Sequence, residues 1–200
     1  MLIRQTCFAA LFGLSLSACA SIVGLENDRA LSQFNTGNYT SAVKTWSRLA
    51  DQGDARAQNN LGVAYMLGQG VEQDSTVAAS FFRSAAIQGF GAAQANIAES
   101  YFKGEGVPQD YVLAARWARL GAIYGDYDSQ FYMGELSLKD LGGVVRDPLR
   151  AYAWYSISAE NGNEQASVEL EALSAKLNDV ERSKAEKILK DCKTSMLNAC

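Results

Sequence analysis

The chain has 200 residues, of which 48% are hydrophobic and 20% are charged, so it is long enough and apolar enough to bury a core. It contains no histidine, which excludes Ser-His and Cys-His nucleophile pairs and any histidine-ligated metal site. The formal net charge is −4, and without a large basic field we expect no nucleic-acid binding. Nothing in this composition points to an enzyme, a metal or a cofactor.

Residues 1–18 are typical of a secretory signal peptide. Arg4 supplies positive charge near the start, a short and mostly apolar run covers residues 7–16, and small residues follow. This run is too short to cross a bilayer as a helix. We therefore expect the segment to direct export and to be removed from the mature protein.

The end of that segment, Leu16-Ser17-Ala18-Cys19, resembles the lipobox of bacterial lipoproteins, in which an aliphatic residue and two small residues precede a cysteine. The resemblance implies cleavage before Cys19 and acylation of that residue, so that its acyl chains anchor the protein in a membrane. Ala20 follows the cysteine, and the absence of an aspartate there favours the outer membrane over the inner one. We expect residues 19–25 to form a short lipidated tether. The alternative is an ordinary signal peptide with a cysteine near its end.

The rest of the chain is organised by a repeat of about 36 residues. Four glycines mark this period with spacings of 36, 36 and 37: Gly53, Gly89, Gly125 and Gly162. An alanine stands eleven residues before each of them, and related loops occupy residues 68–74, 104–110 and 140–147. These matched columns indicate tandem copies of one small structural unit.

Each unit is predicted to be a pair of helices. In residues 42–53 the apolar and small side chains recur at steps of three and four, and Gly53 stands where a left-handed residue would end the helix. Asp54 is suited to cap a second helix over residues 55–67. Three loop aspartates precede the first helix of the next unit: Asp74, Asp110 and Asp147. Their regular spacing favours N-caps in successive units over a carboxylate cluster for acid–base chemistry.

The best-defined unit resembles the Sel-one-like repeat family, which is related to tetratricopeptide repeats. Residues 57–74 carry the pattern A-x-x-x-L-G-x-x-Y-x-x-G-x-G-V-x-x-D, and weaker copies extend the resemblance over residues 39–176. The resemblance implies an all-α fold, an α/α solenoid in which antiparallel helix pairs stack into a right-handed superhelix with a concave face. Residues 26–38 are expected to form an N-terminal capping helix, and residues 177–200 a C-terminal capping helix with a cysteine tail.

Two cysteines, Cys192 and Cys200, lie in that tail region. In an oxidising periplasm, and with Cys19 occupied by lipid, these two remain to form a disulfide. The alternative of two free thiols stays open at this point.

Aromatic residues on the first helices form a stripe that we interpret as core between repeats and not as a ligand cage: Trp46, Phe82, Trp117, Trp154 and Tyr155. Two S-x-x-K patterns, Ser41–Lys44 and Ser100–Lys103, match part of the penicillin-binding nucleophile motif. The accompanying S-D-N box is missing, so an enzyme acting on β-lactams or the cell wall is the least favoured reading.

Function is therefore expected in binding. In tetratricopeptide-like solenoids the helix with the Leu-Gly pair lines the concave groove, and this resemblance implies a protein partner held on that face. Ten side chains are predicted to line it: Arg56, Asn59, Val63, Met66, Glu99, Phe102, Lys103, Phe131, Glu135 and Leu138. For the apolar members the alternative is simple packing between helices.

We accordingly predict a non-enzymatic interaction scaffold, anchored in the outer membrane by lipid on Cys19 and facing the periplasm, that supports assembly of an envelope complex. The alternative is a surface-exposed lipoprotein that binds a host or other external protein. Neither reading requires a metal or a small-molecule cofactor.

Overall fold

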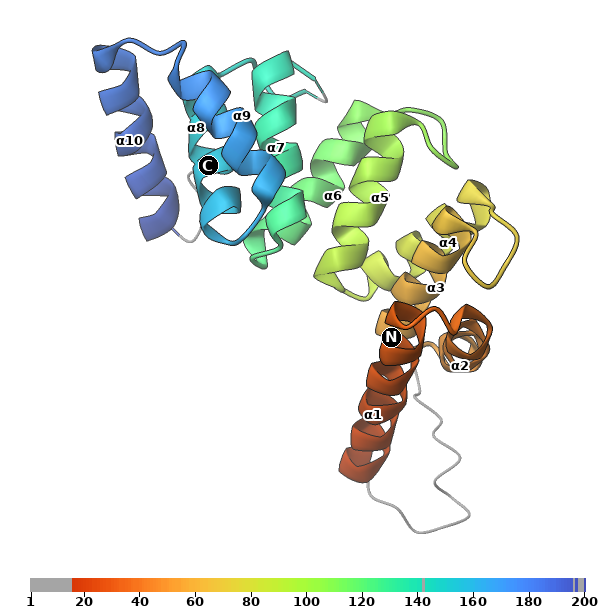
Figure 1. Cartoon of the computed structure of the whole chain (residues 1–200). Helices are drawn as coiled ribbons and strands as arrows, with labels where there is room; N and C mark the ends of the chain where they lie inside the picture. Colours follow the sequence, from red (N-terminus) through yellow and green to blue (C-terminus); the bar gives the residue numbers. More distant parts are fainter. Residues whose placement is uncertain (1–15, 142, 196, 198–199) are drawn as a thin grey trace. The chain divides into compact units, whose positions relative to one another are not determined.

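The computed structural model describes residues 16–141, 143–195, 197 and 200, and within them it contains ten α-helices and no strand (Figure 1). Four helix pairs occupy the repeat region, which confirms the predicted all-α solenoid class. The first helices of the pairs are α2 (Tyr39–Asp51), α4 (Ser75–Ile87), α6 (Tyr111–Ile123) and α8 (Pro148–Glu160). The second helices are α3 (Ala55–Leu67), α5 (Gly91–Lys103), α7 (Tyr127–Lys139) and α9 (Glu164–Ser174). Two further helices, α1 (Leu16–Asn35) and α10 (Asp179–Thr194), flank the pairs.

The loop aspartates act as N-caps, as their spacing predicts. Asp74 Oδ1 accepts hydrogen bonds from the backbone N–H groups of Thr76 at 2.9 Å and Val77 at 3.0 Å. Asp110 and Asp147 each accept the equivalent pair of bonds at the starts of α6 and α8. These side chains satisfy backbone donors that a helix start otherwise leaves without partners, so they are structural and do not form a catalytic cluster.

Glycine ends the first helix of each pair. Gly53 has φ of 87°, and the three glycines of the same column also have positive φ. In this conformation the N–H of Gly53 reaches the carbonyl of Ala50 (2.9 Å) and the N–H of Asp54 reaches that of Leu49 (3.0 Å). The last turn of the helix is therefore closed by backbone bonds, and the second helix can start at once.

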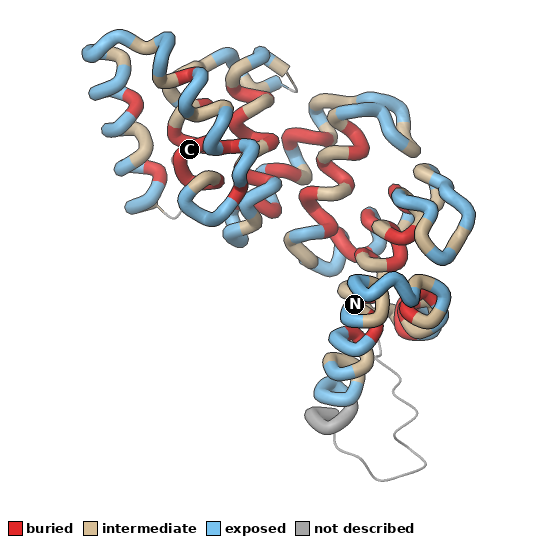
Figure 2. Tube along the Cα trace, in the orientation of Figure 1, coloured by how far each residue is buried: buried red, intermediate tan, exposed pale blue. Residues whose placement is uncertain are grey.

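The chain divides into two compact units, residues 1–88 and residues 89–200, each with its own core. In the first unit α1 to α4 bury Trp46, Leu49 and Leu61 together with small residues of α2 and α3. In the second unit α5 to α10 bury Met133, Leu136 and many alanines, as the buried stretches in Figure 2 show. Small residues at these contacts allow neighbouring helices to approach closely.

The aromatic stripe belongs to these cores. Trp46, Phe82, Trp154 and Tyr155 are each at most 2% exposed, which confirms their predicted role. Trp117 is half-buried because it stands one position before the aromatic column, whose place in this repeat is taken by Ala118.

The N-terminal helix is longer than expected. α1 begins at Leu16 and runs through residues 19–25, so the predicted tether is helical and the capping helix does not start at residue 26. Val23 packs against the core of the first unit, and the Asn27 side-chain amide donates to the Val23 carbonyl (3.2 Å) and to Asp54 (3.0 Å). These contacts hold the segment against α2 and α3. Residues 1–15 of the predicted signal peptide lie outside the described residues.

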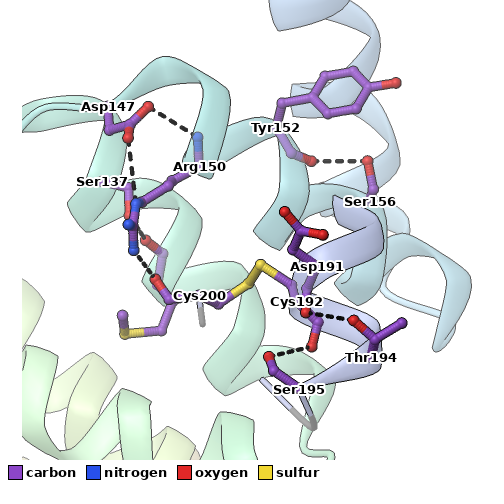
Figure 3. Close-up of a disulfide and its surroundings, with 11 residues drawn as sticks. Ser137, Asp147, Arg150, Tyr152, Ser156, Asp191, Cys192, Thr194, Ser195 and Cys200 are labelled. Carbon is purple, nitrogen blue, oxygen red and sulfur yellow. Dashed lines mark hydrogen bonds and ion pairs between the residues drawn. A yellow bond between two sulfur atoms is a disulfide. The ribbon is translucent and has the colours of Figure 1, made fainter. Parts of the chain in front are cut away.

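At the other end α10 begins at Asp179 as predicted, with Asn178 and Glu181 forming a capping box. Ala185 is fully buried, whereas Val180 is 65% exposed. The helix packs on α8, and Cys192 and Cys200 form a disulfide with Cα atoms 5.0 Å apart (Figure 3). The backbone oxygen of Cys200 also accepts a hydrogen bond from Arg150 at 2.5 Å, so the tail is tied to two helices.

No helix in the described part of the chain combines the length and the hydropathy that a bilayer crossing demands.

Candidate binding groove of the second unit

A groove of about 500 Å³ runs over α5, α7 and α9, which are the second helices of three successive pairs. α5 and α7 lie in direct contact, so side chains that both helices present on this face meet at its floor. The groove is lined by aromatic rings, carboxylates, amides and one lysine: Ala95, Asn96, Glu99, Phe102, Lys103, Asp128, Phe131, Tyr132, Glu135, Asn163, Gln165 and Glu169. A surface of this size and mixed chemistry suits part of a peptide chain.

Five of the ten side chains predicted from the sequence line this groove: Glu99, Phe102, Lys103, Phe131 and Glu135. Leu138 lies instead in a neighbouring hollow of about 480 Å³, where Leu173 and Leu177 also point.

The other four predicted side chains belong to α3 of the first unit. Asn59 is buried, with 6% exposure, so it is not offered to a partner at the surface. Arg56 forms an ion pair with Asp28 of α1 at 2.7 Å, while Val63 and Met66 are half-buried. The capping helix α1 thus occupies an arginine that the sequence pattern assigned to binding.

Rings form the floor of the groove. The ring centroids of Phe102 and Phe131 each lie 5.5 Å from that of Tyr132, and Phe131 lies 5.8 Å from Tyr155 of α8. Phe102 and Phe131 are only half-buried, so they pack between helices and also present apolar surface to the groove. Packing between helices and lining of the groove are therefore compatible roles for Phe102 and Phe131.

Two glutamates are held in the same way, one repeat apart. Lys103 donates to Glu99 and Lys139 donates to Glu135 along their own helices. The Tyr155 hydroxyl donates to Glu135 at 2.7 Å, and Tyr132 forms a hydrogen bond with Glu99.

These bonds affect titration of the bonded groups. The pKa values of Tyr132 and Tyr155 are raised, first by burial and then by the adjoining glutamates. The hydrogen bond to Glu99 raises the pKa of Lys103, against the effect of burial.

Lys139, at the end of α7, contacts two residues that line the groove. Its ammonium group pairs with Glu135 and lies 5.6 Å from the centroid of the Phe102 ring. A carboxylate and an aromatic face thus hold one cation together.

Sequence reasoning missed Asp128 and Glu169. Asp128 accepts a hydrogen bond from the Asn163 side chain at 2.8 Å, which joins the starts of α7 and α9. The pKa of Asp128 is raised to about 6, first by burial and then by the charges of Asp126 and Glu99, against the effect of the Asn163 bond. Glu169 lies on α9, whose sequence matches the repeat pattern poorly. Only the offset of about 36 residues from the earlier second helices could have identified it as a groove residue.

Other chemistry has little support within the described residues. The Ser100 hydroxyl is fully buried and donates to the Asn96 carbonyl at 2.9 Å, so it is not placed as a nucleophile. The residues described include no group of three or more metal-ligating side chains arranged to hold an ion.

Comparison with known proteins agrees with this architecture. Two solved structures are similar to the chain. One is a Sel1 repeat protein from Oxalobacter formigenes, with 29% identity, a TM-score of 0.64, and coverage of 72% of this chain and 59% of that one. The other is a protective antigen present in uropathogenic Escherichia coli strains that displays an SLR fold, with 32% identity, a TM-score of 0.66, and coverage of 77% and 34%. The chain therefore spans less than two thirds of either protein.

No match was found among curated proteins. The model of the Sel1 repeat matches residues 55–90, 91–123 and 128–163, which together make up more than half of the chain. Each matched segment spans the second helix of one pair and the first helix of the next: α3 with α4, α5 with α6, and α7 with α8. The chain belongs to the Sel1 repeat family.

Proposed function

We propose that this protein is a non-enzymatic interaction scaffold of the bacterial envelope, anchored by lipid on Cys19, which binds a partner protein in the groove of its second unit. Sel1 repeat proteins generally mediate protein–protein interactions and are typically non-catalytic. The groove over α5, α7 and α9 is the observation that supports the proposal most directly, because it combines half-buried rings with unburied polar groups on one face.

The test of partner binding uses a bulky substitution at the groove and a matched one beside it. Gln165 lines the groove and is exposed, so Gln165→Tyr fills the space without disturbing the core. Val168 lies on the same helix, is 60% exposed and does not line the groove, so Val168→Tyr is the control.

Crosslinking in native envelopes, with the full mature chain as bait, is expected to lose its protein adducts in Gln165→Tyr and to keep them in Val168→Tyr. Circular dichroism of both variants checks that the helices remain intact. Capture of the same partners by both variants would show that the groove is not the binding surface.

The anchor has its own test. Replacing Cys19 by serine removes the acylation site, and we expect the protein to move to the soluble fraction after cell lysis. A variant that stays membrane-bound in high salt would contradict lipid anchoring.

The side of the membrane that the protein faces needs its own test. The similar E. coli protein is described as a protective antigen, which favours surface display as the second candidate. Protease treatment of intact cells separates the two arrangements. Protection supports a periplasmic scaffold, and rapid digestion supports a surface-exposed binding protein.

A further inference from the structure

The groove carries more negative than positive charge. Four carboxylates line it, and those of Glu99 and Glu135 are neutralised by lysines of their own helices. Among the residues that the structure describes, Asp128 and Glu169 form no ion pair. Their side-chain donors are neutral amides, Asn163 at 2.8 Å for Asp128 and Gln165 at 3.2 Å for Glu169.

These two carboxylates are accessible. Asp128 keeps an exposed surface, although neighbouring groups partly desolvate its carboxylate, and Glu169 is half-buried; both border the same groove as the half-buried ring of Phe131. Lys139, at the far end of α7, illustrates what such a set of groups attracts, since it is held by a carboxylate together with an aromatic face.

We propose that the partner bound in this groove presents a basic peptide segment, with a lysine or arginine side chain that pairs with Asp128 and Glu169 and lays its alkyl stem along Phe131. The inference rests on the proposed function and specifies the chemistry of its partner. Charge complementarity selects this occupant, because an acidic segment would be repelled by the two carboxylates that have no ion-pair partner among the described residues. The arriving cation supplies the positive charge that no described side chain gives to Asp128 or Glu169.

The titration of Asp128 is consistent with this choice. Its pKa is raised to about 6 by burial and by the charges of Asp126 and Glu99, so the free groove holds this carboxylate ionised against an unfavourable field. A bound cation would lower that pKa, and by linkage the affinity for a basic peptide rises as Asp128 loses its proton.

The experiment is selection of a phage-displayed library of linear peptides on the immobilised mature chain. The test protein carries Asp128→Asn and Glu169→Gln, which keep side-chain shape and remove two charges. The control carries Glu171→Gln and Glu186→Gln, which remove two exposed carboxylates outside the groove. Equal helicity and a cooperative unfolding transition in each establish that all three proteins are folded.

We expect peptides selected on the unmodified chain to be enriched in lysine and arginine. The best of them should bind the test protein about tenfold more weakly and the control unchanged. Selection of acidic or purely apolar peptides, or equal binding of basic peptides to the test protein, would overturn the inference.

Its failure can be told apart from failure of the proposed function. If native crosslinks are lost in Gln165→Tyr but persist in Asp128→Asn/Glu169→Gln, the groove binds a partner by other chemistry and only this inference falls. If native crosslinks are lost in both variants, both statements are supported.

Discussion

Asp128 is the residue whose titration reports most directly on the groove. Its titratable and polar neighbours are Asp126 at the N-cap of its own helix, Tyr132 on that helix, Glu99 on α5, and Asn163 at the start of α9. Its pKa in the folded protein is about 6, above the ordinary value of 3.8. The folded state therefore binds a proton more tightly than the unfolded chain between those values.

The raised pKa of Asp128 in the folded state fixes the direction in which stability changes with pH. The contribution of Asp128 to the free energy of unfolding is fully present below about pH 4 and is lost as the pH rises through about 6. We expect Asp128→Asn to remove this decline and to be more stable than the unmodified chain at neutral pH. Urea unfolding at several pH values measures the difference, and carboxyl NMR titration measures the pKa itself. A value near 4 would contradict the account.

Asp140 occupies a backbone conformation that other repeats give to glycine. Its φ is 56°, and the same column holds Gly68 with φ of 67° and Gly104 with φ of 77°. A left-handed residue with a side chain costs about 1–2 kcal/mol, whereas glycine adopts this conformation freely and loses about 0.5–1 kcal/mol through entropy.

Asp140→Gly is therefore expected to raise the free energy of unfolding by about 0.5–1 kcal/mol. Urea denaturation followed by circular dichroism measures the change, with Asp140→Ala as the comparison that keeps a Cβ. If the alanine variant gained as much as the glycine variant, the side-chain carboxylate and not the backbone would be the cause.

Much at this scale could be predicted because capping depends on local sequence. An aspartate one residue before a helix reveals its role by its position alone, and Asp74 shows the expected bonds. Asp128 could not be recognised in that way, since its environment is created by Glu99 and Asn163, which lie far away in the chain.

Packing between elements follows a size rule that repeats along the chain. Gly62 on α3 faces the ring of Phe82 on α4, and Gly134 on α7 faces the ring of Tyr155 on α8. In the intervening repeat the same two columns hold Ala98 and Ala118, both fully buried. At each of these contacts glycine faces a ring or alanine faces alanine, which limits the combined volume of the two facing side chains.

Gly62→Ala tests this rule. A Cβ at that position would lie 2.6 Å from a carbon of the Phe82 ring, which is 1% exposed and has no space to move into. We expect the free energy of unfolding to fall by about 1–3 kcal/mol, despite the higher helix propensity of alanine.

The control is Gly24→Ala on α1, where a Cβ meets nothing within 4 Å. That variant should gain about 1 kcal/mol from helix propensity. Denaturant unfolding of the two proteins should therefore give changes of opposite sign, and equal gains in both would refute the packing rule.

The disulfide secures α10 and the following tail on α8. Cys192 and Cys200 are separated by eight positions, and both half-cystines are buried in the core of the second unit. Replacing both by serine should lower the free energy of unfolding by about 2 kcal/mol, because a short closed loop constrains the unfolded chain modestly. Comparing unfolding with and without a reductant checks this: the reductant should destabilise the unmodified chain and leave the variant unchanged.

Helix boundaries show where local reasoning ends. The repeats start within a residue or so of the predicted positions, because caps and glycines mark them. The start of α1 was missed, since what holds residues 19–25 as a helix is the packing of Val23 and the bond from Asn27 to Asp54. Neither contact leaves a periodic signal in that short segment.

At the scale of the whole molecule, the two units have separate cores. The core residues of the second unit all come from residues 89–200, as do the disulfide and every side chain of the groove. In repeat proteins each element depends mainly on its sequence neighbours, so stability is built from local interfaces. The sequence period predicted one uninterrupted array, and it could not reveal this division, because the columns continue across residue 89 without a change of spacing.

We therefore expect residues 89–200 to fold when expressed without the first unit. The fragment keeps four sets of buried contacts, between α5 and α6, α6 and α7, α7 and α8, and α8 and its neighbours α9 and α10. Circular dichroism should show a helical protein with a cooperative thermal transition, and dispersed amide resonances should show fixed packing. The fragment should also bind the basic peptides selected on the full chain with unchanged affinity, since the whole groove lies within it. A fragment that is helical but lacks a cooperative transition would mean that α5 needs the first unit as a cap, and that the groove is formed only in the intact array.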